Sequence, residues 1–106
     1  MVIKFYRGDD HSVKFRFLNF NGTIDEIYFT IKNQKKETIL HKRLKDGIDI
    51  VDDYYVINFV PNDTDNIDIY LEMEYDIQIV VDNKKYTIAK NKFILDEDIT
   101  TPENEV

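Results

Sequence analysis

The sequence has 106 residues, of which 42% are hydrophobic and 33% charged, and this suits one domain with a single core. It contains no cysteine, which excludes disulfides, Cys-ligated metals and thiol chemistry and suits a reducing compartment. The net charge of -7 would repel nucleic acid and anionic lipid. No apolar run is long enough to cross a bilayer, and the charged start lacks the apolar centre of a secretory signal. We therefore expect a soluble, untargeted protein.

Alternation of apolar and polar residues with period 2 dominates the chain and predicts β-strands with one buried face. The first two expected strands are residues 2–6 and 12–18. Between them, residues 7–9 read Arg-Gly-Asp, the tripeptide that adhesion proteins present to integrins. We interpret it as a turn, because Gly8 can adopt a positive φ and the aspartates that follow can accept hydrogen bonds from the backbone of the turn.

The middle of the chain contains four further expected strands, of which the second fits strict alternation poorly. Asn21-Gly22 is a strong turn signal before the first of them. Pro61 ends the last, because proline has no N–H group to donate to the ladder. These expected strands are residues 26–33, 37–44, a short stretch at 48–50, and 53–60.

The last third of the chain begins with the one segment, 61–71, in which a helical turn is expected, with Ile67 tucked under the core. A hairpin follows, and we expect a bulge or kink within 89–91. From residue 99 the sequence is acidic and has no pattern, which predicts a flexible tail. The expected strands of this part are residues 74–81, 86–89 and 92–95.

About seven short strands, separated by turn signals and without room for crossover helices, predict an all-β fold. The residues alone favour an antiparallel β-sandwich or a small barrel. We expect one domain over residues 1–98 and an acidic tail over 99–106.

Catalytic residues are not expected. His11 lies beside Asp9, Asp10 and Ser12, but neighbouring residues on a strand point to opposite faces, so His11 and Ser12 would diverge. The only other histidine is His41. With 21 acidic residues in the chain, pairs of carboxylates arise from composition alone. We expect a protein that is not an enzyme.

A calcium loop is the one metal site that the sequence suggests. Asp63, Asp65 and Glu74 occupy the first, third and twelfth places of such a loop. The fifth place, however, is Ile67, and the sixth, which requires glycine, is Asp68. We expect no metal and no cofactor.

Exposed sheet faces offer a candidate ligand or interface surface. Tyr28, Tyr54 and Tyr70 are predicted to point outward and could form a platform for carbohydrate, although tyrosine is common on exposed sheets. Val56 and Val80 also fall on nominally outer faces. Together with open sheet edges, these residues indicate that a partner protein covers part of the sheet.

Six segments, in order between residues 7 and 100, carry a resemblance to a known family: RGDDHSVKFRF, IYFTIKNQKK, LHKRLKDGIDI, YYVINFVPNDT, YDIQIVVDNKKYTIAKNKFIL and a final DIT. The chain resembles the N-terminal domain of phage baseplate upper proteins and related small virion proteins. The resemblance implies an antiparallel Ig-like β-sandwich without catalytic residues. In the larger baseplate proteins further structure bearing receptor-binding modules follows, whereas here the sequence stops at Val106.

The resemblance leads us to expect a phage or prophage structural protein, in the tail or baseplate, that contacts other virion proteins or copies of itself. Its expected location is the virion, and the host cytoplasm during assembly. A capsid decoration or neck protein is the alternative within this class. A carbohydrate-binding module is the alternative from another class.

Overall fold

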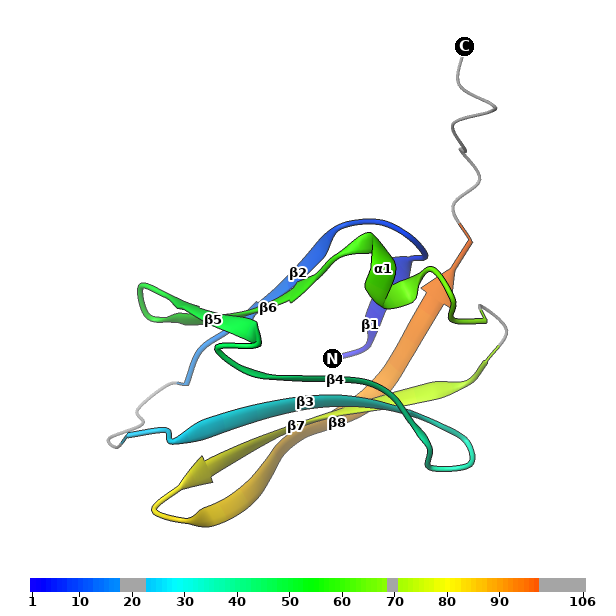
Figure 1. Ribbon diagram of the computed structural model, residues 1–106. Helices are drawn as coiled ribbons and strands as arrows, with labels where there is room; N and C mark the ends of the chain where they lie inside the picture. Colours follow the sequence, from blue (N-terminus) through cyan, green and yellow to red (C-terminus); the bar gives the residue numbers. More distant parts are fainter. Residues whose placement is uncertain (18–22, 69–70, 98–106) are drawn as a thin grey trace.

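The computed structural model describes residues 1–17, 23–68 and 71–97 (Figure 1). Within these residues the chain forms eight β-strands and one short helix, so the prediction of an all-β fold is confirmed. The elements are β1 (Ile3–Tyr6), β2 (His11–Phe15), β3 (Glu26–Asn33), β4 (Thr38–Leu44), β5 (Gly47–Val51), β6 (Tyr54–Phe59), α1 (Pro61–Thr64), β7 (Met73–Val81) and β8 (Lys84–Asp96).

The strands form a single sheet in the order β1-β8-β7-β3-β4-β5-β6-β2. Most neighbours are antiparallel, as predicted. However, β1 runs parallel to β8, and β4 meets β5 in a short parallel pairing, so the prediction of a wholly antiparallel arrangement is wrong at these two places. The eight strands agree with the prediction of about seven. The short stretch expected at 48–50 is the strand β5, and the stretches expected at 86–89 and 92–95 are one strand, β8.

The sheet curls so that its two edge strands meet. The ring of Phe5, on β1, stacks on the ring of His11, on β2, with centroids 4.1 Å apart and planes 2° from parallel. Figure 1 shows β2, β5 and β6 facing β3, β7 and β8 across the interior. The result is a nearly barrel-like molecule in which the inner faces of both halves of the sheet share one core.

The chain passes from one half to the other in the tight turn between β4 and β5. Two residues of this turn, Lys45 and Gly47, have positive φ angles of 71° and 97°. The N–H group of Arg43 donates to the carbonyl oxygen of Asp46 at 3.0 Å, and this closes the turn. The φ of Gly47 lies where side chains are rarely tolerated, which explains glycine at this place.

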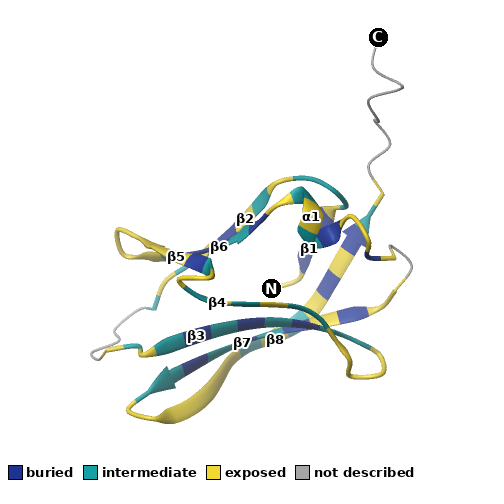
Figure 2. Cartoon of the chain, in the orientation of Figure 1, coloured by how far each residue is buried: buried dark blue, intermediate teal, exposed yellow. Residues whose placement is uncertain are grey.

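Strand alternation builds the core as the sequence predicts. Buried and less buried bands alternate along the last residues of β8, 93–96, in Figure 2, and buried residues alternate with less buried ones along β3 and β7. Phe59 lies at the centre of an aromatic cluster, with ring centroids 4.8 Å from Phe5 and 5.5 Å from Phe29. Because these three rings come from β1, β3 and β6, they hold both halves of the sheet together.

Two local features differ from the expectations. The irregular alternation of β4 has two causes. A bulge at Ile39 shifts the register between the pairs of Ile31 with Leu40 and Lys32 with Thr38, and Lys42, paired with the buried Phe29, sits at an inward position. Its Nζ atom lies 2.9 Å from the carboxylate of Asp63, on α1. The bulge of β8 lies at Ile88, where the register to β7 shifts, and not within 89–91 as expected.

The helix α1 is one turn long, as predicted, and Ile67 beyond it is buried at 8% exposure. No helix in the described part of the chain is long and apolar enough to span a membrane. The expected turn at Asn21-Gly22 and the expected tail, 99–106, lie outside the described residues.

Candidate interaction surface

The Arg-Gly-Asp segment forms a turn that docks on α1. Gly8 has a φ of 83°, which confirms the predicted turn. Its N–H group donates to the hydroxyl oxygen of Thr64 at 2.8 Å, and Thr64 is fully buried. We expected an aspartate of the turn to accept this hydrogen bond, but the acceptor is Thr64. Arg7 Nη1 donates to the carbonyl oxygen of Ile67 at 3.5 Å, so the arginine also faces the protein.

His11 joins the two edge strands. Besides stacking on Phe5, its Nε2 atom lies 3.3 Å from the backbone nitrogen and 3.2 Å from the carbonyl oxygen of Tyr6. One tautomer accepts from the nitrogen and the other donates to the oxygen. These contacts give His11 a role in closing the sheet.

Two acidic residues of the suggested calcium loop, Asp63 and Glu74, make contacts within the fold. Asp63 accepts from the N–H group of Val60 at 2.9 Å and pairs with Lys42. Glu74 lies on β7, where its carboxylate is 3.6 Å from Lys90. Within the ranges that the structure describes, no group of three or more His, Asp or Glu side chains could hold a metal ion.

Tyr28 lies on the outer face of β3 among basic groups. Its ring stacks on His41, with centroids 5.6 Å apart. The guanidinium of Arg43 and the ammonium of Lys85 lie 5.7 and 5.6 Å from the ring centroid. Cations over the ring compete with any sugar that would stack there.

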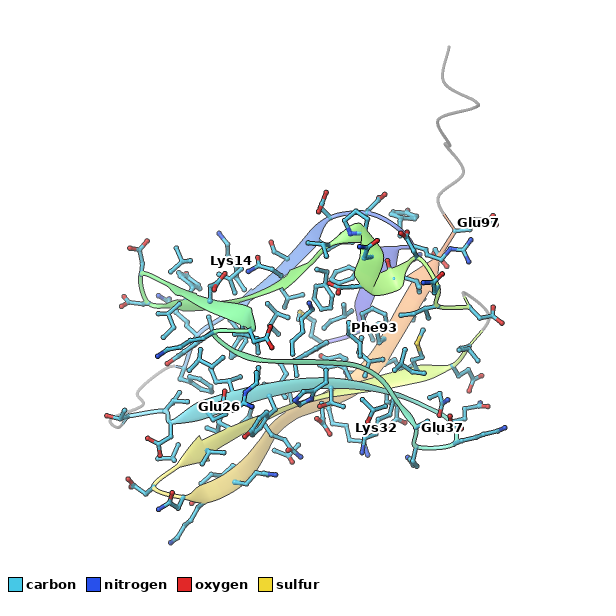
Figure 3. All side chains as sticks on the ribbon, viewed as in Figure 1. Lys14, Glu26, Lys32, Glu37, Phe93 and Glu97 are labelled. Atoms are coloured by element: carbon cyan, nitrogen blue, oxygen red, sulfur yellow. The ribbon has the colours of Figure 1, made fainter. Side chains whose placement is uncertain are left out.

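Glu26, two residues before Tyr28, fixes the end of β4 (Figure 3). One carboxylate oxygen accepts from the N–H groups of Ile27 and Leu44, at 3.1 and 3.0 Å, and the other lies 2.6 Å from Arg43. Burial raises the pKa of Glu26, but the hydrogen bonds from Arg43 and from the two backbone groups lower it more. The net pKa lies below the usual value for glutamate.

Tyr54 and Val56 lie on β6, in the opposite half of the sheet from Tyr28. Tyr54 is 38% exposed, and the guanidinium of Arg16 lies 5.3 Å from its ring centroid. Val56 is only 7% exposed, although it was expected on an outer face. It sits on a central strand between Lys14 and Asp49, and a small side chain in such a place is covered by its longer neighbours.

Val80 is half-buried on β7, directly opposite Glu26 on β3, and so lies near Tyr28. Tyr70 lies outside the described residues. Of the residues predicted for a ligand or interface face, the structure therefore brings Tyr28 and Val80 to one surface and places Tyr54 on another.

A surface that the sequence analysis did not single out lies over β1 and the end of β8. Tyr6 and Ile94 are 50% and 38% exposed, and the pairing of β1 with β8 sets them on the same outer face. Leu71, 40% exposed, adjoins Ile94 at a cavity of ≈ 400 Å³. We call Tyr6, Leu71 and Ile94 the apolar strip. The signal was present in the sequence, since Ile94 stands between the inward Phe93 and Leu95.

That cavity is lined by both core residues and charged residues. Phe93, which points into the interior in Figure 3, and Met73 are buried, whereas Lys92 and Glu72 are exposed. Hollows lined by apolar and charged residues occur at protein contact sites, where a partner side chain can fill them.

Comparison with known proteins finds no protein-family model and no curated protein that matches this sequence.

Proposed function

We propose that this protein is a non-enzymatic structural component of a phage or prophage virion, in the tail or baseplate, that assembles through protein–protein contacts. The ordered resemblance over residues 7–100 is the basis for the virion assignment. The observation that carries the mode of action is the apolar strip beside its cavity, because neighbouring exposed apolar side chains next to a hollow are features of protein interaction sites.

The proposed function goes together with an Ig-like fold. We infer that the curled sheet is a variant of the Ig-like sandwich, with β2, β5 and β6 as one layer. The other strands form the second layer, and the turn between β4 and β5 joins the two. The shared core between the halves supports this assignment.

Immunogold labelling tests the proposed function. Antibody is raised to the purified chain and applied to particles released from the source organism after prophage induction. Label at tail tips is the expected result. Label on heads would instead favour the capsid decoration alternative, and label at the head-to-tail junction a neck protein. Particles without label, with the antigen shown to be accessible and present in the lysate, would contradict a virion role.

A glycan array separates this proposal from a carbohydrate-binding module. Tyr28 and Tyr54 lie in opposite halves of the sheet, which does not support one flat sugar platform. We expect no glycan binding by the wild-type protein. Binding that is lost in Tyr28→Ala or Tyr54→Ala would favour the carbohydrate module.

A further inference from the structure

The long last strand, β8, has an open edge. It pairs with β7 through residues 84–93, but β1 covers its other side only through residues 93–96. Within the described ranges, no strand pairs with that other side between residues 84 and 92. The hairpin of β7 and β8 projects beyond the other strands in Figure 1. A strand of this length with one free side is a template for a further strand.

The open edge is basic and partly apolar. Four of its nine residues are lysines, at positions 84, 85, 90 and 92, and none is acidic, although the whole chain carries a charge of -7. Tyr86 and Ile88 on the same edge are 49% and 40% exposed. Pairing with a further strand would bury part of these two side chains and bring opposite charges to the lysines.

The charges disfavour one occupant and favour another. If two copies paired edge to edge about Ile88, Lys84 would face Lys92, and like charges directly opposite are destabilising. By contrast, segment 97–106 contains four acidic residues and no basic one. This segment follows the C-terminal end of β8, whereas the open edge begins at Lys84, at the other end. At the C-terminal end β1 already pairs with β8. To reach the open edge of its own chain, the segment would therefore have to pass β1.

We propose that the open edge of β8 binds segment 97–106 of a second copy of this chain as an added strand. The pairing covers residues up to 101, since Pro102 has no N–H group to donate. The edge of β8 and the segment 97–106 are different parts of the chain, so the contact is head-to-tail. Such a contact repeats from copy to copy and forms a ring or a filament. This inference rests on the proposed function, to which it adds the partner and the mode of contact.

Sedimentation velocity of the full chain at low salt tests the proposal. We expect association that increases with concentration and weakens with salt. A chain shortened to residues 1–97 and the variant Lys84→Glu/Lys92→Glu should both remain monomeric. The matched control Lys35→Glu/Lys45→Glu, which changes the same charge on the turns before and after β4, should associate like the wild type.

Peptides separate strand addition from charge attraction alone. A peptide of residues 97–106 should bind the 1–97 chain and slow amide hydrogen exchange over residues 84–91. The same peptide with Ile99→Pro keeps its charges but loses the N–H donor of residue 99. It should bind at least tenfold more weakly, the loss expected from about 1.4 kcal/mol. Equal binding of both peptides would overturn strand addition.

Two further results would overturn the proposal. A full chain that stays monomeric at its highest soluble concentration excludes a second copy as the partner. Association that persists in the 1–97 chain places the contact elsewhere. Neither result alters the immunogold experiment, which reports on the presence of the protein in the particle.

Discussion

At Gly8 the backbone adopts a conformation that side chains tolerate poorly. Five residues other than glycine have positive φ in the described part of the chain, all between 51° and 71°. Gly8 and Gly47, at 83° and 97°, lie beyond that range. The left-handed region that other residues can adopt therefore does not include these two φ angles. Glycine is required at both positions by conformation.

The first prediction concerns Gly8. Gly8→Ala should lower the free energy of unfolding by about 1–3 kcal/mol, because alanine at this φ is strained. Urea denaturation followed by circular dichroism measures the change. Asp10→Ala, in the same turn, is the control and should have little effect. An alanine variant as stable as the wild type would show that the turn relaxes without cost.

A second prediction at this scale concerns Glu26 and pH. The pKa of Glu26 is lower in the folded protein than in the unfolded chain. As the pH falls, the carboxylate of the unfolded chain therefore binds its proton first. The stabilisation by Glu26 is thus present above its usual pKa of about 4.3 and is lost as the pH falls through the lower folded value.

Denaturation of wild type and Glu26→Gln between neutral and acid pH measures this contribution. The wild type should be more stable at neutral pH, and the difference should shrink as the pH falls. Arg43→Gln should reduce the same difference, because the guanidinium supports the ionised carboxylate. Since Arg43 is half exposed, high salt should weaken its effect. A difference that does not vary with pH would contradict the assignment.

Among the elements, β4 and α1 are connected by the ion pair of Lys42 and Asp63. The two side chains are 12% and 17% exposed, and the ammonium also lies 5.5 Å from the ring centroid of Phe59. Removal of one partner leaves the other charge poorly solvated. A mostly buried pair of this kind is more sensitive to single substitutions than an exposed one.

A double-mutant cycle tests this connection. Lys42→Met and Asp63→Asn should each cost about 2–3 kcal/mol, less than for a fully buried pair because some solvent contact remains. The double variant should cost less than the sum of the two single variants. The exposed pair of Lys4 and Asp96 is the control, for which we expect almost no coupling. Additive losses at Lys42 and Asp63 would mean that the pair is not a unit.

Local alternation allowed most strands to be predicted, because inward and outward positions leave a direct trace in the sequence. The bounds of β3 were predicted at both ends, and β6 within one residue. The partner of each strand is not encoded locally: the parallel pairing of β1 with β8 joins opposite ends of the domain. The same limit applies to Lys42, whose inward place makes sense only once Asp63 is known to lie across the core.

The candidate surface was harder to predict than the fold. Alternation correctly sets Tyr28 and Tyr54 outward, but it does not reveal that they belong to opposite halves of the sheet. It also assigns Val56 to an outer face without showing that neighbouring strands cover it. Exposure on a curled sheet depends on strand order, which has no local signal.

For the whole molecule, one core implies one unfolding transition. The core cluster draws buried residues from seven of the eight described strands, and β4 adds partly buried ones. No half of the sheet has a core of its own. We therefore expect two-state unfolding, with far-ultraviolet circular dichroism and tyrosine fluorescence giving the same midpoint.

Phe59 is the residue at which this cooperativity can be tested. Its ring is 2% exposed and contacts Phe5 and Phe29, from the edge and the centre of the sheet. Phe59→Leu should lower the free energy of unfolding by about 1–3 kcal/mol without changing the dependence on denaturant. Ile94→Ala, on the exposed apolar strip, should change stability little. If circular dichroism and fluorescence gave different midpoints for Phe59→Leu, the halves of the sheet would unfold independently. The contact of Phe5 with His11 would then not be enough to hold the two halves together.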